Sequence, residues 1–146
     1  MTKITAQPEN ATRLIDRLVT AARNAQMVLG TSRFAARQMA LREAAQRIRA
    51  ERSDLLAANK KDLAAAVKSG LSDAFIDRLT LTESRIEDVA VGLETIATQS
   101  DPIGAELAHW QRPNGLDITR QSTPLGIIGV IYESRPNVTI DAAGLC

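Results

Sequence analysis

Cysteine, histidine and aromatic residues are scarce in this 146-residue sequence, and it has no long apolar run. A single cysteine, Cys146, cannot form an internal disulfide, which fits a protein of the reducing cytoplasm. The single histidine, His109, has no companion histidines or cysteines with which to form a zinc site. The longest apolar run, Leu125 to Tyr132, is far too short to cross a bilayer, and residues 1–8 lack the apolar core of a signal peptide.

An excess of charge of one sign is also missing. Lysine and arginine number 18 against 17 aspartate and glutamate residues, which gives a net charge of +1. This near-neutrality supplies no electrostatic footprint for binding nucleic acid or an anionic membrane. The share of apolar residues, 45% with 24% charged, is that of a soluble globular protein.

Residues 10–100 show the apolar spacing of helices. We expect five helices: one capped by Asn10 and ending at Gly30, one from Thr31 or Ser32, one capped by Ser53 or Asp54 and divided at Asn59 before Gly70, one from Ser72, and one after Thr82. Many positions on the apolar faces are alanine, and aromatic residues make up only 3% of the chain. Because such a layer buries little apolar area by itself, we expect it to pack on another part of the structure.

Beyond Asp101 the helical spacing disappears. Residues 106–111 can form a strand, and Arg112-Pro-Asn-Gly115 is a turn signal. Alternation of apolar and polar residues from Leu116 to Arg120 then predicts the second strand of a hairpin. The sequence-level alternatives for this hairpin are an edge that protects its own sheet and a contact with another subunit.

The last part of the sequence predicts a strand, a turn and a helix. The run Leu125 to Tyr132 is apolar on both faces, which is typical of a strand buried in a parallel sheet. Either Asn137 or Thr139 can cap a helix that follows and extends to Cys146. A parallel strand without a parallel partner cannot satisfy its backbone donors and acceptors, so we expect these residues to be part of a longer polypeptide.

The segment Thr123-Pro-Leu-Gly-Ile-Ile-Gly-Val-Ile-Tyr-Glu-Ser-Arg-Pro-Asn-Val138 closely resembles the signature of the γ-glutamyl phosphate reductases, and Thr139–Cys146 continues the likeness. The string from Tyr132 to Asn137 differs from the Pro-Trp-Asn type of turn found in most aldehyde dehydrogenases, a superfamily that shares the preceding strand. Further segments that resemble the family, in the same order, are Ala58–Asp62, Ser69–Ser72, Asp77–Thr82 and Asp101–Gly104.

This resemblance implies an α/β fold, the N-terminal part of an aldehyde-dehydrogenase-like fold. Residues 1–146 would be a partial N-terminal cofactor-binding domain. Its parts would be a helical layer (1–100), a β-hairpin (105–123) and the first strand, turn and helix of a Rossmann-like nucleotide-binding core (124–146). The catalytic domain would be absent. In the superfamily a hairpin just before this strand joins subunits, so residues 105–123 are the expected contact of a homo-oligomer.

The activity that the resemblance implies is the reduction of L-glutamyl 5-phosphate to L-glutamate 5-semialdehyde with NADPH, with release of phosphate, in proline biosynthesis. In the family a cysteine thiolate attacks the acyl carbon and expels phosphate, and hydride from NADPH then reduces the thioester. That cysteine lies in a later Ser-Thr-Cys-Asn motif, which this sequence does not contain. We therefore expect the 146 residues alone to be inactive.

Four residues near the predicted turn are candidates for the site. Asn137 could stabilise the oxyanion of acyl transfer, and its structural alternative is a helix N-cap. Arg135 could bind the phosphate or carboxylates of the substrate, or it could form an ion pair with Glu133. The backbone of Tyr132 and Glu133 could line part of a cofactor site. No metal site is expected.

Other readings remain open. Gly126 and Gly129 lie within the predicted strand and form no G-x-G-x-x-G fingerprint, so they indicate close packing rather than a phosphate loop. Cys146 matches a helix position rather than the nucleophile motif, and His109 is expected to be a packing residue in its strand. The alternative functions are a non-catalytic module that binds a full-length subunit and an aldehyde dehydrogenase of different substrate.

Overall fold

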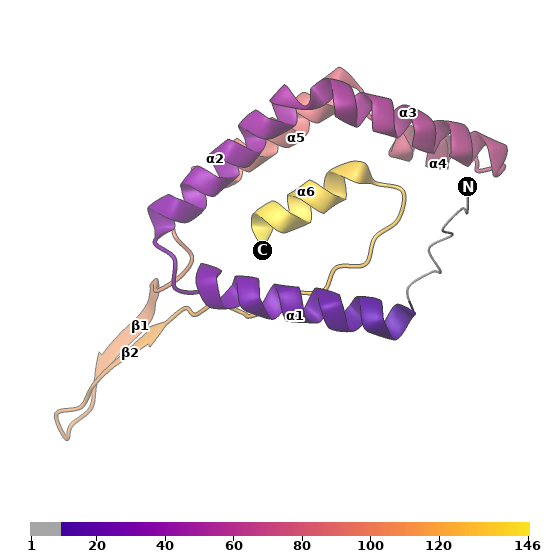
Figure 1. Ribbon diagram of the computed structural model, residues 1–146. Coiled ribbons are helices and arrows are strands. Elements are labelled where there is room, and N and C mark those ends of the chain that lie inside the picture. The colour runs from indigo at the N-terminus through magenta and orange to yellow at the C-terminus, as the bar shows by residue number, and fades with distance from the viewer. Residues whose placement is uncertain (1–9) are drawn as a thin grey trace.

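The computed structural model describes residues 10–146, which form an open arrangement of helices and one hairpin (Figure 1). Within that range the elements are α1 (Ala11–Leu29), α2 (Phe34–Ala50), α3 (Arg52–Lys68), α4 (Asp73–Leu79), α5 (Glu83–Ile96), β1 (Glu106–Gln111), β2 (Asp117–Gln121) and α6 (Pro136–Leu145). The helices expected over residues 10–100 and the hairpin after them are confirmed. No helix of residues 10–146 is long and apolar enough to span a membrane.

Side chains cap two helices at the starts that the sequence predicts, and of these Asn10 was expected as a cap. The side chain of Asn10 accepts a hydrogen bond of 3.0 Å from the backbone N–H of Thr12 at the start of α1. The hydroxyl of Thr82 accepts one of 3.1 Å from the backbone N–H of Arg85 at the start of α5. Each bond satisfies a donor that the first turn of a helix leaves without a partner.

The start of α3 differs from the prediction. This helix follows α2 after a single residue, Glu51, which is the C-cap of one helix and the N-cap of the other. Ser53 and Asp54, the expected caps, therefore lie inside the first turn. An aspartate there still favours the helix, because its negative charge lies near the positive end of the helix dipole.

The predicted break at Asn59 is wrong, because α3 continues through this residue. Asn59 is only 4% exposed and faces the connection between α4 and α5. Its Nδ2 donates to the carbonyl of Leu79 at 2.8 Å, and its Oδ1 accepts from the backbone N–H of Leu81 at 2.8 Å. The amide thus supplies a donor and an acceptor to a segment that forms no helix or strand bonds there.

The core lies where α5 packs along α2 and α6 packs against α5 (Figure 1). At its centre Ala45 and Ala90 are fully buried beside Leu93. Alanine at the contact lets two helices approach closely, since no long side chain separates their backbones. The alanine-rich helices therefore do pack on further elements, as their composition predicts, and the side chains around this centre are Leu41, Ala44, Ile48 and Ile140.

An arginine on α2 bridges two glutamates on α5. The guanidinium of Arg49 donates to both carboxylate oxygens of Glu87, with a shortest distance of 2.8 Å, and to both of Glu94, with a shortest distance of 2.5 Å. The two glutamates lie seven residues apart, two turns of the same helix face. The hydrogen bonds from Arg49 hold the pKa of both carboxyl groups below the ordinary glutamate value, against the opposing effect of desolvation.

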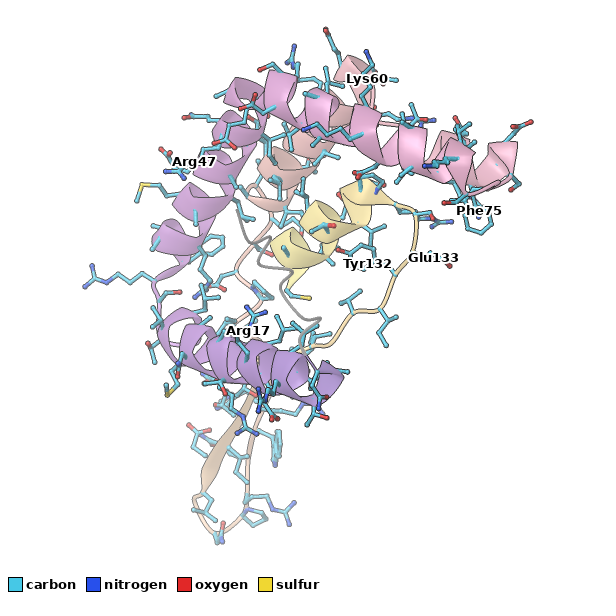
Figure 2. All side chains as sticks on the ribbon, turned by 45° about the vertical axis from the view of Figure 1, so that its right-hand side comes forward. Arg17, Arg47, Lys60, Phe75, Tyr132 and Glu133 are labelled. Carbon is cyan, nitrogen blue, oxygen red and sulfur yellow. The ribbon has the colours of Figure 1, made fainter. Side chains whose placement is uncertain are left out.

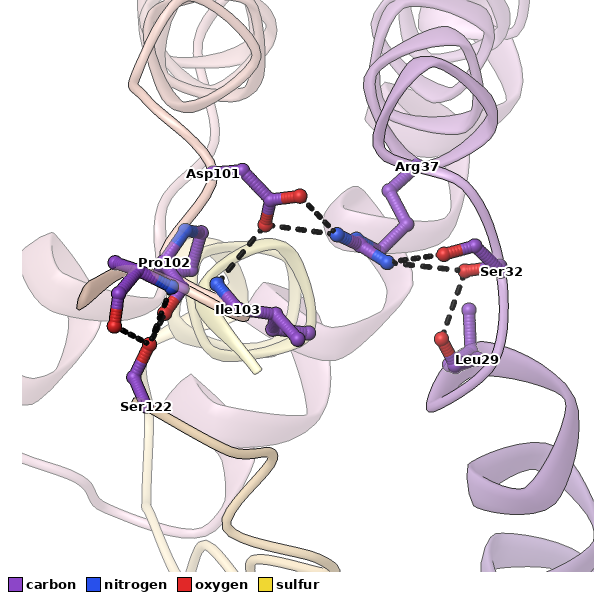
Figure 3. Close-up of polar contacts among 8 residues, drawn as sticks. Leu29, Ser32, Arg37, Asp101, Pro102, Ile103 and Ser122 are labelled. Atoms are coloured by element: carbon purple, nitrogen blue, oxygen red, sulfur yellow. Dashed lines mark hydrogen bonds and ion pairs between the residues drawn. The ribbon is translucent and has the colours of Figure 1, made fainter. Parts of the chain in front are cut away.

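A second arginine ties the start of α2 to the chain that leaves α5 (Figure 3). Arg37 Nη2 lies 2.8 and 2.9 Å from the two carboxylate oxygens of Asp101, and its Nη1 donates to the carbonyl of Ser32. Asp101 also accepts from the backbone N–H of Ile103 at 3.0 Å. Because the hydroxyl of Ser122 donates to the carbonyl of Pro102, both ends of the hairpin are anchored next to this ion pair.

The hairpin extends away from the helices (Figure 1). Its strands are antiparallel, with Trp110 opposite Ile118 and a bulge near the start of β1. At the predicted turn Gly115 has φ +88°, a backbone conformation that glycine adopts without a steric penalty. Local turn chemistry and alternation thus determine this element as expected.

The strand expected over Leu125–Tyr132 is not formed. The segment runs as unpaired chain, and its side chains are exposed, with Leu125 at 90% and Ile131 at 102%. The buried parallel strand is not formed within residues 10–146, whose one sheet is the two-stranded hairpin, and it stays a prediction for a longer polypeptide. A strand needs a neighbour to accept and donate its backbone hydrogen bonds, and none of these residues supplies one.

Replacing Asn59 with alanine should destabilise the chain by about 2 kcal/mol or more, because it leaves the Leu79 carbonyl and the Leu81 N–H without partners. Urea unfolding followed by circular dichroism measures this loss. The matched control is Lys60→Ala, one residue along α3 on its exposed surface (Figure 2), which should leave stability within about 0.5 kcal/mol. Equal effects of the two substitutions would contradict the assigned role of Asn59.

The Arg49 bridge should make stability depend on acid pH. The folded-state pKa values of Glu87 and Glu94 lie below the ordinary value of 4.5. The two ionised carboxylates therefore contribute fully to the stability of the fold above pH 4.5, and this stabilisation is lost as the pH falls through the lowered pKa values. The double variant Glu87→Gln, Glu94→Gln should therefore lose less stability than the wild type between about pH 6 and about pH 3. Denaturant titrations at a series of pH values test this, with Glu43→Gln on the exposed face of α2 as the control. Parallel pH profiles for wild type and double variant would refute it.

Candidate functional site

The turn that leads into α6 has an unusual backbone. Ser134 has φ +51°, in the left-handed region that residues other than glycine seldom adopt. Arg135 is the N-cap of α6, and Pro136 occupies a first-turn position, where its fixed φ and missing N–H cost nothing. The hydroxyl of Tyr132 lies 2.5 Å from that of Thr139, which joins the incoming chain to the helix across the turn.

Asn137 lies in the first turn of α6. Its N-cap reading is wrong, because Arg135 occupies that position and no side-chain capping bond is made there. The side chain is exposed, and its Nδ2 donates a 3.0 Å hydrogen bond to Oδ2 of Asp141, one turn further along the helix. Sequence reasoning did not single out Asp141, although the spacing of four residues on one helix was a signal that could have found it.

Two open grooves meet at Asn137. One, of about 260 Å³, is mainly apolar and lies between α6 and the facing helices α2, α3 and α5. The other, of about 280 Å³, is more polar and runs along α5 beneath Asn137 and Asp141. The remaining lining of the apolar groove is Ile48, Leu55, Leu81, Ile86, Val89, Pro136, Thr139 and Ile140, and that of the polar groove is Thr80, Leu81, Arg85, Asp88 and Val89.

The other candidates lie along the turn. Tyr132 and Glu133 stand on the segment that enters α6 (Figure 2), and both are exposed. Arg135 is exposed as well, and within residues 10–146 no ion pair joins it to Glu133. The four candidate residues thus lie within one short stretch of chain. Two of them, Tyr132 and Asn137, form side-chain hydrogen bonds with residues of α6.

The single cysteine and the single histidine of the sequence lie away from this turn. Cys146 is exposed at the end of α6, where its backbone N–H donates to the carbonyl of Ala142. His109 is on the hairpin and contacts Asp117 diagonally across the two strands. Since its side chain is 45% exposed, the expectation of a packing residue is wrong. In the described part of the chain, no group of three His, Cys, Asp or Glu side chains could hold a metal ion.

Close packing fixes where α6 sits. A Cβ atom added at Gly144 would lie 2.6 Å from Cδ2 of Leu93 and 3.3 Å from Cδ1 of Ile96, both on α5. Ile140, one turn earlier on α6, packs against the buried cluster of α2 and α5. The first turn of α6 is thereby held above the two grooves.

No family model matches this chain. Three curated relatives, each named γ-glutamyl phosphate reductase, do match it. The protein from Hyphomonas neptunium is 58% identical over 125 residues, 86% of this chain and 29% of the relative. That from Paramagnetospirillum magneticum is 52% identical over 125 residues, 86% and 30% of the two chains. That from Parvibaculum lavamentivorans is 48% identical over 141 residues, 97% and 33%.

Solved structures give the same result. The crystal structure of γ-glutamyl phosphate reductase from Thermotoga maritima superposes with a TM-score of 0.86 at 34% identity, over 90% of this chain and 32% of that one. The enzyme from Saccharomyces cerevisiae superposes with a TM-score of 0.83 at 29% identity, over 93% and 34%. The chain thus has the fold of the N-terminal region of these oxidoreductases.

Sequence and fold together identify the chain as a relative of the γ-glutamyl phosphate reductases, as its motifs predict. It spans about a third of the length of the curated relatives that it matches.

Gly144→Ala should destabilise the chain by about 1–3 kcal/mol, although alanine ordinarily favours a helix over glycine, because the new methyl group collides with Leu93. The matched control is Gly92→Ala in α5, where the added Cβ has no atom within 4 Å apart from the adjacent residues and the backbone of its own helix, and which should stabilise by up to about 1 kcal/mol. Urea unfolding of both variants measures the effect. A gain in stability for Gly144→Ala would show that α6 is seated differently.

Proposed function

We propose that this chain contributes the N-terminal region of an enzyme that reduces L-glutamyl 5-phosphate to L-glutamate 5-semialdehyde and releases phosphate, the step of proline biosynthesis for which the relatives are named. The observation that carries the proposal is sequence identity of 48–58% to those reductases over most of the chain. The TM-score of 0.86 to a solved γ-glutamyl phosphate reductase also supports it. We place the activity in the cytoplasm, in keeping with the single cysteine of the sequence.

The chemistry requires a nucleophile and a reductant from outside these residues. A thiolate attacks the acyl carbon, the carbonyl oxygen becomes an oxyanion, and collapse of this intermediate expels phosphate and leaves a thioester. NADPH, the cofactor that we propose, would supply the hydride that converts this thioester to the aldehyde with release of the thiolate. This chain has neither the Ser-Thr-Cys-Asn motif nor a G-x-G-x-x-G loop.

The described residues do not form a complete nicotinamide site by themselves. The segment 124–133 runs as unpaired, largely exposed chain, so it presents no edge of a parallel sheet along which a dinucleotide could lie. We propose only that the backbone at Tyr132 and Glu133 borders that site in the whole enzyme.

Asn137 is the residue of this chain that we propose to take part in the reaction. Its amide is exposed in the first turn of α6, where the positive end of the helix dipole also favours an anion. A side-chain N–H aimed at a developing oxyanion lowers the barrier to acyl transfer by a few kcal/mol. Arg135, exposed two residues earlier, is proposed to bind the phosphate or a carboxylate of the substrate.

We also propose that the hairpin joins subunits of a homo-oligomer. Both of its strands have a free edge within residues 10–146, and Leu107, Trp110 and Leu116 are exposed on it. Exposed apolar side chains on a projecting hairpin are typical of a surface that another chain covers. An alternative role for the 146 residues, binding to a full-length subunit without catalysis, would use the same surface.

The hairpin contact can be tested in a chimera in which these 146 residues replace the matching region of the Hyphomonas neptunium relative. Trp110→Ser should reduce the molar mass of this chimera measured by light scattering, and an unchanged mass would exclude the hairpin contact.

The test of activity uses a chimera in which these 146 residues replace the matching N-terminal region of the Hyphomonas neptunium relative, the 58% identical protein. The assay follows phosphate-dependent reduction of NADP by glutamate 5-semialdehyde, which is the reverse reaction. Turnover by the chimera, with none by the 146 residues alone, is the expected result. A folded but inactive chimera beside an active relative would contradict the proposed function.

Within the active chimera, Asn137→Ala should lower kcat at least about a hundredfold, because one donor to the oxyanion is lost. The Michaelis constant for the substrate should change little, since the amide acts on the charge that develops in the transition state. Arg135→Ala should instead raise the Michaelis constant. Unchanged turnover of Asn137→Ala at saturating substrate would exclude an oxyanion role.

A further inference from the structure

We infer that Asp141 is a positioning residue for Asn137: its carboxylate fixes the orientation of the amide that faces the oxyanion. The inference rests on the proposed function of Asn137 and extends it to a residue that makes no contact with the reacting atoms. Both residues lie on α6, four positions apart, so their side chains emerge on one face of the helix.

The hydrogen bond between them determines which end of the amide faces the carboxylate. An ionised carboxylate only accepts hydrogen bonds, so the group that lies 3.0 Å from Oδ2 of Asp141 must be the NH₂ of Asn137 and not its carbonyl. An asparagine without such a partner can rotate and exchange the places of its oxygen and nitrogen. Asp141 is half-buried whereas Asn137 is exposed, and both line the polar groove along α5.

The second N–H of the amide remains available for a ligand. Nδ2 carries two hydrogens, and the bond to Asp141 uses one of them. With the amide plane fixed by that bond, the other hydrogen keeps one direction above the grooves. A rotated amide would present its carbonyl oxygen instead, and that oxygen would repel an oxyanion.

The charge of Asp141 works against the oxyanion, so the benefit must come from orientation. A negative charge one helical turn from a developing anion raises its energy, and the effect is partly screened because this part of α6 is open to solvent. The N-terminal end of α6 supplies an opposing positive potential. Removal of the acceptor at position 141 should therefore lower the rate even though it also removes an unfavourable charge.

The first test observes the amide directly in the 146-residue chain by ¹H–¹⁵N nuclear magnetic resonance. We expect one side-chain amide proton of Asn137 to be shifted and protected from exchange relative to the other. Asp141→Ala should return the shift and the exchange rate of that proton to those of a free primary amide, whose two protons differ only through slow rotation about the C–N bond. Asp88→Ala should leave the shift and the protection, because Asp88 lines the same groove without a hydrogen bond to Asn137 among the described residues. Amide protons of the wild type that match those of a free asparagine, or an unchanged spectrum in Asp141→Ala, would overturn the inference.

The second test separates positioning from a purely structural role in the active chimera. Asp141→Ala should lower kcat about tenfold or more, with the Michaelis constant within about twofold, a smaller loss than that of Asn137→Ala. Asp141→Glu, which keeps an acceptor-only carboxylate, should recover most of the rate. In the Asn137→Ala background, Asp141→Ala should cause no further loss, because a residue that acts through Asn137 has nothing left to orient.

Each outcome has a distinct meaning. An inactive parent chimera contradicts the proposed function and leaves the resonance experiment to decide whether Asp141 fixes the amide. An active chimera in which Asp141→Ala keeps full kcat contradicts the inference alone. Additive losses in the double variant would mean that Asp141 acts independently of Asn137, and this would also overturn it.

Discussion

The contact between α2 and α5 is the constraint on which the rest of the structure depends. Two fully buried alanines, Ala45 and Ala90, let the helices lie close together, and Arg49 bridges them at the solvent side with two glutamates. Every other described element except α1 attaches to this pair or to a segment next to it. The hairpin starts beside the Arg37–Asp101 ion pair, and α6 packs on Leu93.

How far the sequence predicts this fold depends on how local each signal is. The caps at Asn10 and Thr82 and the turn at Gly115 bond within a few residues, and all three are where the sequence places them. Asn59 was misread because its partners lie 20 and 22 residues away on another element, so an amide that joins helices looked like one that ends a helix. The run from Leu125 has the composition of a strand, but composition alone cannot supply a pairing partner, and none lies in residues 10–146.

In the candidate site, too, the sequence predicts the local features and misses the contacts between distant segments. The motif around Asn137 indicates the residue type and its place at the start of a helix, and the structure places it there. The N-cap alternative failed because Pro136 begins the helix one residue earlier, with Arg135 as the cap. The grooves on either side of Asn137 join residues from α2, α3, α5 and α6, and no spacing within one segment could have revealed them. Asp141 lay within reach of sequence reasoning, but only geometry shows that the two side chains bond.

The exposed run from Leu125 to Ile131 has a consequence for the chain as a polypeptide in solution. It has no charged residue and no proline, and it is rich in β-branched side chains, the composition of segments that self-associate as cross-β structure. Its backbone donors and acceptors have no strand partner in residues 10–146, so copies of this segment can satisfy one another. We therefore expect the apparent molar mass of the isolated chain, measured by light scattering, to rise with its concentration. Any polypeptide that supplies a neighbouring strand would then act as a folding partner and a suppressor of aggregation at once.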